Sequence, residues 1–354
     1  MKIKLPYSEA DAEINRGPLP PILRFHDGTP VKSTRDWKRR LAEIEAAIIP
    51  VEYGGMPPET KPKATKAEPI SESSVEKFTK VPGSSMNKYA VTVEGGAEPV
   101  NFGLTVWTPG GDGPFPVVLN GDACWSYLTP QVVAMALRRG FAIASFNRCE
   151  VARDRVGAQN VGIYRAFPGT YGALSAWAWT YHRAYDALLR NPRIDTSKVI
   201  VTGHSRGGKT VELATATDKR IAMVADNCSG CGGFGCFRVS GKGCEHLSDI
   251  TRAFPFWFAP DFAKWAGHEE DLPFDQHYLA ALIAPRLRLV QVAKGDTWAN
   301  PVGACVSFRA SVEAYRFLGA EENNHIVFRN GGHSHSLIDW RHTLDFAEKN
   351  LLGK

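Results

Sequence analysis

The chain has 354 residues and a net charge of +5, with 22% charged and 44% hydrophobic residues. This composition can bury a substantial core, and the length corresponds to one large domain or two of ordinary size. No long run carries charge of one sign, so we expect no nucleic-acid partner. No stretch approaches the roughly 18 apolar residues of a membrane helix, so we expect no membrane partner. Residues 1–15 lack the apolar region that would predict a signal peptide.

The first 75 residues are rich in Pro, Lys and Glu. Four apolar side chains recur at helical spacing: Trp37, Leu41, Ile44 and Ile48. This periodicity predicts an amphipathic helix over 34–47, and the stretch 54–74 is typical of a linker or a segment wrapped on the surface. We therefore expect an N-terminal helix and wrapping segment over 1–75 and a catalytic domain over 76–354, together forming one compact unit.

Two alternating runs at 88–93 and 101–108 are separated by glycine and proline, which predicts a β-hairpin. From there, strand and helix patterns alternate. The expected strands cover 116–120, 141–146, 198–202, 221–225, 288–293 and 325–328. The expected helices cover 129–139, 172–190, 208–217 and 339–351. Such alternation predicts an α/β fold with a mostly parallel central sheet flanked by helices, a three-layer sandwich.

Residues 203–207 read Gly-His-Ser-Arg-Gly, a G-x-S-x-G motif between a predicted strand and a predicted helix. In the α/β-hydrolase fold this motif holds a nucleophilic serine on a strained turn, where the flanking residues must be small. The N–H that follows the serine lies at a helix N-terminus and helps to bind an oxyanion. The motif therefore predicts an α/β-hydrolase fold with Ser205 as nucleophile. The alternative is a glycine-rich turn with an inert serine.

Two basic residues, Arg206 and Lys209, lie next to Ser205 in the sequence. A positive pocket suits an anionic substrate, or an oxyanion bound by a side-chain donor. A solvated helix face is the alternative for both residues.

The other catalytic residues follow the last two predicted strands, since the order in this fold is nucleophile, acid and histidine. After the last strand, residues 329–336 contain two candidates for the general base, His333 and His335. We prefer His333 because it directly follows two glycines. Asp296 is the one acidic residue in the loop after the preceding strand, so we predict that it orients the histidine. The alternative for Asp296 is a structural role in a turn.

Four of the seven cysteines crowd into residues 228–244: Cys228, Cys231, Cys236 and Cys244. The first two have the spacing of half a zinc site, which the other two and His246 could complete. The segment is rich in glycine, and buried thiols are common core fillers, so we predict no metal. One disulfide within the group is a further alternative.

Motifs along nearly the whole chain resemble one family. The nucleophile segment is similar to a Gly-x-Ser-Arg-x-Gly-Lys pattern, and a tryptophan-rich segment precedes it at 172–179. Further similar segments are 25–29, 36–37, 227–233, 272–277, 281–286, 296–298 and 332–333. Together they resemble carbohydrate esterase family 15, the glucuronoyl esterases, which hydrolyse esters between 4-O-methyl-glucuronic acid on xylan and alcohols of lignin.

The resemblance implies roles for individual residues. By position, Ser205 is the nucleophile, His333 the base and Arg206 the residue that stabilises the oxyanion. The substrate-binding residues that it implies are Lys209, Trp298 and Glu245. The family needs no metal, and no cofactor is expected here.

Three departures from the family pattern are visible, one of which is the segment 234–243, where the family usually has an arginine-containing stretch. Many members place the acid directly before a Ser-Gly-x-Gly-Gly segment, where this chain has Cys228. The resemblance to the remaining members implies Asp296 instead. Fungal members also carry a pair of cysteines where this chain has His204 and Ser336, so their disulfide is not expected.

The sequence and the resemblance thus predict a serine esterase acting on 4-O-methyl-glucuronoyl esters of glucuronoxylan through an acyl-enzyme. One alternative is an acetylxylan esterase or another carbohydrate esterase. A carbohydrate-binding protein without catalytic activity is the second. Family members are usually exported, but the sequence itself indicates no compartment, and it indicates no oligomeric state.

Overall fold

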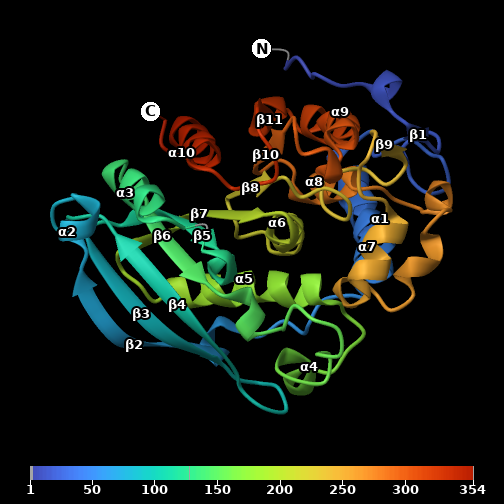
Figure 1. The fold of residues 1–354 in the computed structure, drawn as a ribbon. Coiled ribbons are helices and arrows are strands. Elements are labelled where there is room, and N and C mark those ends of the chain that lie inside the picture. The colour runs from blue at the N-terminus through green and yellow to red at the C-terminus, as the bar shows by residue number, and fades with distance from the viewer. Residues whose placement is uncertain (1–2, 127, 354) are drawn as a thin grey trace.

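The computed structural model of the chain describes residues 3–126 and 128–353. Within these residues the strands form a nine-stranded sheet and a small ribbon of β1 (Ile14–Asn15) and β9 (Val239–Ser240) (Figure 1). Across the large sheet the strands are, in order, β11 (Asn324–Arg329), β10 (Leu287–Ala293), β8 (Met223–Asn227), β7 (Ile194–His204), β5 (Phe115–Asn120), β6 (Ala142–Phe146), β4 (Val100–Thr108), β3 (Ser85–Val93) and β2 (Thr65–Ser74).

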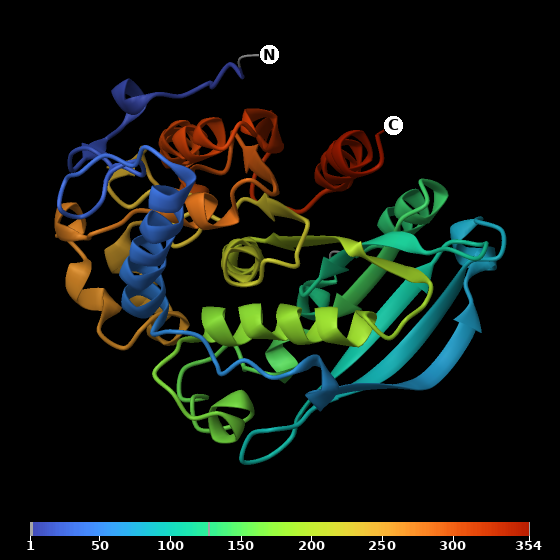
Figure 2. The ribbon, with the colours of Figure 1, turned by 180° about the vertical axis from the view of Figure 1, so that it is seen from behind.

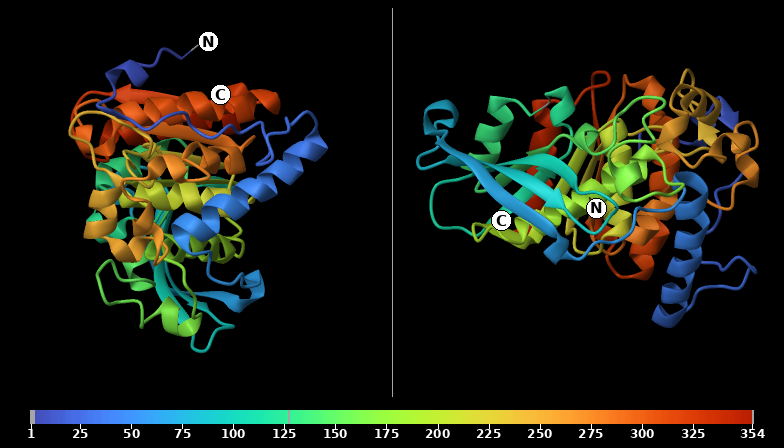
Figure 3. Two further views of the ribbon diagram at one scale, coloured as in Figure 1. Left: turned by 90° about the vertical axis from the view of Figure 1, so that its right-hand side faces the viewer. Right: turned by 90° about the horizontal axis from the view of Figure 1, so that it is seen from below.

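The strands from β11 to β6 run parallel to one another, whereas β4, β3 and β2 continue the sheet in antiparallel order. Figure 3 shows these antiparallel strands at one end of the molecule. β3 and β4 are the two runs that were predicted as a hairpin, which confirms that prediction. In the parallel part, the carboxyl ends of the strands meet at one edge, where ligand sites of open α/β sheets form.

Helices cover both faces of the parallel part of the sheet (Figures 1 and 2). One face carries α5 (Ala173–Leu188), α6 (Arg206–Thr217), α8 (His277–Ile283) and α9 (Pro301–Phe317), and the other carries α3 (Pro130–Arg138) and α10 (Leu337–Leu351). Successive side chains of a strand point to opposite faces. Accordingly, Val118 of β5 belongs to the cluster around Trp340 of α10, whereas Val117 belongs to the cluster around Trp177 of α5. This arrangement confirms the predicted three-layer fold.

Every residue of α5 is buried, because the helix lies between the sheet and the chain segments that follow α1. The indole N–H of Trp177 donates to the carbonyl oxygen of Ala152 at 2.7 Å, and that of Trp179 donates to the carbonyl oxygen of Pro58 at 3.0 Å. These tryptophans therefore belong to the core. No helix in the described parts of the chain is long and apolar enough to span a bilayer.

The N-terminal helix α1 (Thr34–Tyr53) begins where it was predicted and continues beyond residue 47. Ser33 and Asp36 form a capping box at its start, and Gly54 ends it in the left-handed conformation. The helix packs against α8 (Figure 2).

The stretch 54–74 was expected to be a linker or a segment wrapped on the surface. Residues 65–74 form β2, the exposed edge strand of the sheet, so the linker alternative is wrong there. Most β2 side chains are exposed, so the run has no apolar face that would predict a strand, and its pairing with β3 stabilises it. Other elements outside the predicted set are α7 (Leu247–Ala253), α8, α9 and the single turns α2 (Glu76–Thr79) and α4 (Ile163–Ala166). The division of the chain at residue 75 stays a prediction.

Candidate active site

Ser205 lies on the turn between β7 and α6, with φ of 57° and ψ of −121°. A positive φ is uncommon and strained for a residue with a side chain, and such strain concentrates at functional sites. The backbone N–H of Ser205 donates to the carbonyl oxygen of Asn227 at 2.9 Å, which ties the turn to the end of β8. The serine is partly exposed at the carboxyl edge of the sheet.

The glycines around Ser205 are required by close contacts. A Cβ on Gly203 would lie 2.4 Å from the carbonyl oxygen of Gly207, and a Cβ on Gly207 would lie 2.3 Å from Oδ1 of Asp122. Real Cβ atoms do not approach other atoms this closely. The G-x-S-x-G motif therefore reflects the packing of the turn against its neighbours.

Asp122 supports this turn from the end of β5, although no sequence motif predicted this role. Its Oδ2 accepts the backbone N–H of His204 at 2.8 Å, and its Oδ1 contacts the guanidinium of Arg148. Burial raises the pKa of Asp122, and the charge of Arg148 opposes that rise. Its position directly after a predicted buried strand is the feature of the sequence that could have indicated it.

His333 and Asp296 come together on the loops after β11 and β10. Nδ1 of His333 lies 2.6 Å from Oδ2 of Asp296. The carboxylate is 3% exposed and the imidazole 42% exposed, so the acid is enclosed while the base remains accessible. The two loops are themselves joined, because the N–H of Gly295 donates to the carbonyl oxygen of Gly331 at 3.0 Å.

Arg329, at the end of β11, supports the histidine loop, and no sequence motif predicted this role either. Its guanidinium donates to the carbonyl oxygens of Gly332 at 3.1 Å and Ser334 at 2.6 Å, on both sides of His333. Its Nε donates to Oδ1 of Asp339 at 2.6 Å. A planar guanidinium with several donors suits this bridging role.

The neighbour of the nucleophile, His204, connects the two halves of the site. The ring centroids of His204 and His333 are 4.4 Å apart, and Nδ1 of His204 lies 2.6 Å from Oδ1 of Asn227. Burial lowers the pKa of His204 to about 3, and the nearby His333 adds to that effect. His204 is therefore neutral at physiological pH.

His335, the second candidate for the base, is buried and stacks on Trp340 with 4.9 Å between ring centroids. Burial lowers its pKa to about 4. The structure thus places His333 against Asp296, and His335 in the layer between the sheet and α10.

Cys228 directly follows β8 and packs with Ala293 and Ala299. Burial raises the pKa of its thiol, and the charge of Asp296 raises it further. All seven cysteines carry free thiols. Among the described residues, no group of three or more His, Cys, Asp or Glu side chains could hold a metal ion.

Arg206, directly after the nucleophile, is partly exposed and held by charge and by aromatic rings. Its Nη1 donates to Oδ2 of Asp154 at 2.6 Å. Its Cζ lies 4.5 Å from the ring centroid of Trp257, 4.8 Å from that of Phe254 and 5.3 Å from that of Trp125. Such cation–π contacts fix the position of the guanidinium.

Lys209 is buried one turn into α6. Its ammonium donates to the carbonyl oxygens of Ser229 and of Cys231, the latter at 2.6 Å. Burial lowers the pKa of Lys209, whereas the charge of Glu245 opposes that shift. Conversely, burial raises the pKa of Glu245 and the charge of Lys209 opposes it, so the two groups lie within electrostatic reach of each other.

Trp298 lies in the loop that carries Asp296 and is 53% exposed. Its carbonyl oxygen accepts the backbone N–H of Glu245 at 3.0 Å. The three residues expected to bind substrate thus form one connected group, in which Glu245 is linked to Trp298 by a hydrogen bond and to Lys209 by charge.

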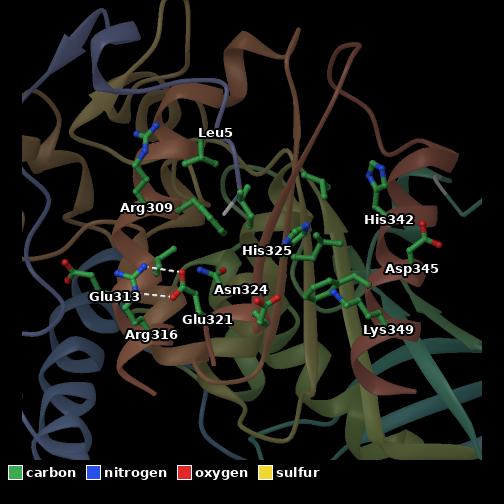
Figure 4. A pocket seen from close by; sticks show the side chains of 17 residues that line it. Leu5, Arg309, Glu313, Arg316, Glu321, Asn324, His325, His342, Asp345 and Lys349 are labelled. Carbon is green, nitrogen blue, oxygen red and sulfur yellow. Dashed lines mark hydrogen bonds and ion pairs between the residues drawn. The ribbon is translucent and has the colours of Figure 1, made fainter. Parts of the chain in front are cut away.

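A separate pocket lies between α9, β11 and α10 (Figure 4). Its labelled side chains carry charges of both signs, and Arg316 donates to Glu321 through two hydrogen bonds of 3.0 and 3.1 Å. None of the candidate catalytic residues is among the described residues that line it.

A serine on a strained strand-to-helix turn, with a histidine and an aspartate on the loops after later parallel strands, defines an ester hydrolase of the α/β-hydrolase type. Residues 91–319 match the family model for fungal glucuronyl esterases. A 4-O-methyl-glucuronoyl methylesterase of Schizophyllum commune is 30% identical over 95% of this chain and 83% of its own length.

Solved structures agree with this match. A family 15 glucuronoyl esterase from Caldicellulosiruptor kristjansonii is 30% identical with a TM-score of 0.81, covering 97% of this chain and 92% of that one. A glucuronoyl esterase from Sporotrichum thermophile in complex with methyl 4-O-methyl-β-D-glucopyranuronate is 25% identical with a TM-score of 0.77. The match covers 99% of this chain and 92% of that one. The chain belongs to carbohydrate esterase family 15, the glucuronoyl esterases.

Proposed function

We propose that this chain hydrolyses 4-O-methyl-glucuronoyl esters, such as those that join glucuronoxylan to an alcohol, through an acyl-enzyme on Ser205. The hydrogen bond between His333 and Asp296, on loops beside the strained serine, carries the chemical part of the proposal. The names of the relatives, and the methyl glucuronate ester in complex with one of them, support the substrate class.

In the first half of the reaction, His333 accepts the proton of Ser205 while the serine oxygen attacks the carbonyl carbon at C6 of the glucuronoyl group. Asp296 accepts the Nδ1–H of His333, which fixes the tautomer that presents Nε2 to the serine. The tetrahedral intermediate carries a negative charge on the former carbonyl oxygen. The backbone N–H and the guanidinium of Arg206 stabilise that charge.

The intermediate collapses when His333 returns its proton to the departing alcohol, which leaves glucuronate esterified to Ser205. Water then attacks the acyl-enzyme with His333 as base, and the same oxyanion site serves again. Collapse of this second intermediate releases the glucuronic acid and restores the serine.

Specificity for the acid side of the ester is assigned to Lys209, Glu245 and Trp298. The ammonium of Lys209 is held by two carbonyl oxygens, and its third N–H can be donated to a sugar hydroxyl. Glu245 supplies an acceptor, and the exposed ring of Trp298 supplies a face of the kind on which sugar rings pack.

The test compares turnover of benzyl glucuronate and of an acetyl ester by the wild-type chain and by Ser205→Ala. Hydrolysis of the glucuronate ester by wild type and its loss in Ser205→Ala supports both the substrate class and the nucleophile. Turnover of the acetyl ester alone contradicts the substrate class. A Ser205→Ala variant that retains the wild-type rate contradicts the acyl-enzyme mechanism.

A further inference from the structure

The guanidinium of Arg206 has one anionic partner among the described residues, and that partner comes from a distant part of the chain. Asp154 lies in the irregular segment between the turn at residues 148–150 and α4. Its Oδ2 accepts Nη1–H of Arg206 at 2.6 Å. The exposed fractions of the Asp154 and Arg206 side chains are 14% and 24%, so solvent only partly screens the pair.

Asp154 also holds one of the rings that pack on Arg206. Its Oδ1 accepts the indole N–H of Trp257 at 2.9 Å, while the face of that indole lies 4.5 Å from Cζ of Arg206. Phe254 stacks on Trp257 with ring centroids 3.9 Å apart and planes 4° from parallel, and it packs on Arg206 as well. Carboxylate, indole and guanidinium thus form a closed triangle of contacts.

This triangle restricts a side chain that is otherwise free to rotate. An arginine loses side-chain conformational entropy when it is fixed in one rotamer. In an enzyme, that ordering is best completed before the reaction, because donors that are already in place stabilise a developing charge without reorganisation. The interaction with Asp154 uses Nη1, which leaves Nη2 and Nε of Arg206 without an acceptor among the described residues.

We propose that Asp154 is a positioning residue for catalysis, which holds the guanidinium of Arg206 in the orientation that stabilises the oxyanion. The role rests on the proposed ester hydrolysis. It does not depend on the identity of the acid, because every ester that Ser205 attacks passes through an oxyanion intermediate. Asp154 contacts neither the serine nor the histidine among the hydrogen bonds of the described residues.

The experiment is a double-mutant cycle on the full chain with Asp154→Ala, Arg206→Ala and the double variant. Each is assayed for kcat and KM on benzyl glucuronate and on 4-nitrophenyl acetate. We expect Asp154→Ala to lower kcat about 10- to 100-fold on both esters, with KM changed much less, because a misplaced donor weakens transition-state binding. The double variant should be no slower than Arg206→Ala, because Asp154 acts through Arg206.

Trp257→Phe is the comparison variant, since it keeps the ion pair and an aromatic ring beside Arg206 while it removes the indole N–H and part of the ring surface that packs on the guanidinium. Its loss in kcat should be smaller than that of Asp154→Ala. If Asp154→Ala does not fold, Asp154→Asn is used in the same cycle, because it retains the size of the side chain and an acceptor for the indole. A kcat equal to wild type in the folded variant, or losses that multiply in the double variant, would overturn the proposal.

The two ester substrates separate this proposal from the proposed function. If wild type hydrolyses the acetate but not the glucuronate ester, the substrate class fails and the cycle on the acetate still tests Asp154. If wild type hydrolyses the glucuronate ester and Asp154→Ala is equally fast, the proposed function stands and the positioning role fails.

Discussion

Asp296 and His333 are 37 residues apart in the chain, and Oδ2 of one lies 2.6 Å from Nδ1 of the other. They meet because β10 and β11 are parallel neighbours in which Ala293 pairs with Arg329, so the loops that follow leave the sheet side by side. A charge-assisted hydrogen bond between an enclosed carboxylate and an accessible imidazole holds the ring in one orientation.

Replacing Asp296 with asparagine should therefore lower kcat about 10³- to 10⁴-fold. A neutral amide can favour the imidazole tautomer that cannot accept the serine proton, and it does not stabilise the positive charge of the imidazolium. Cys228→Ser is the control at the position where many family members carry the acid. Its thiol is neutral at assay pH, since burial raises its pKa, so we expect a kcat near that of wild type. Steady-state kinetics on benzyl glucuronate checks both variants, and equal losses in the two would contradict the assignment of Asp296.

The two histidines of the loop should respond differently to substitution. His333→Gln should lower kcat by about 10²- to 10⁴-fold, the usual contribution of a general base. His335→Gln should mainly lower the free energy of unfolding, by about 1–3 kcal/mol, because it disturbs a buried ring that stacks on Trp340. Kinetics together with urea unfolding separates the two effects. A His335 variant that unfolds like wild type but has lost its activity would reverse the assignment.

Gly207→Ala should destabilise the turn that carries Ser205, by about 1–3 kcal/mol, and should reduce activity as well. The added Cβ would lie 2.3 Å from Oδ1 of Asp122, a buried carboxylate that cannot move without losing its contact with Arg148. Gly332→Ala is the control, because a Cβ there meets no atom within 4 Å. Thermal unfolding of both variants checks the prediction, which fails if Gly207→Ala melts with wild type.

Arg288 and Glu212 form a fully buried ion pair between β10 and α6, with hydrogen bonds of 3.0 and 2.7 Å. Arg288→Met should lower the free energy of unfolding by about 3–5 kcal/mol, because it leaves a carboxylate buried without its partner. The exposed pair of Arg316 and Glu321 gives the comparison, and Arg316→Met should change stability by at most about 1 kcal/mol. Equal effects of the two substitutions in urea unfolding would contradict this reasoning.

Four buried histidines should make the protein less stable in acid. Burial lowers their pKa values from 6.5 to about 4 for His182, about 3 for His204, about 4 for His277 and about 4 for His335. Below pH 6.5 each of these histidines binds a proton in the unfolded chain but not in the folded chain, so their contribution lowers the free energy of unfolding as the pH falls from 6.5 toward 4. Urea unfolding at several pH values checks this, and His182→Gln should reduce the slope.

Glu52 gives a control of opposite sign. Burial raises its pKa from 4.5 to about 8, so the folded chain retains a proton that the unfolded chain loses. Its stabilising contribution is complete below pH 4.5 and is lost as the pH rises to about 8. The free energy of unfolding of Glu52→Gln minus that of wild type should therefore be larger at pH 8 than at pH 4.5. A difference that does not change with pH would contradict the assigned shift.

The sequence alone predicted the parts of the molecule that depend on neighbouring residues. The alternation of strand and helix patterns predicted the parallel sheet, because the burial of each strand and helix leaves a pattern of apolar residues in its own short stretch of sequence. The turn at Ser205 was predicted because close contacts require glycine at the positions two residues before and two residues after the serine, which leaves a local motif in the sequence. The start of α1 was predicted because a helix begins where apolar periodicity begins.

Only the tertiary structure decided which distant groups meet. The pairing of β2 with β3 stabilises a polar strand that has no apolar period of its own. His333 and His335 lie in the same loop but have different surroundings. His333 contacts Asp296, whereas His335 stacks on Trp340. The hydrogen bond between Asp154 and Arg206 joins residues that are 52 positions apart in the chain, so no local sequence pattern predicts it. Periodicity and turn chemistry are properties of neighbouring residues, whereas these contacts arise only when the packed sheet brings separate loops together.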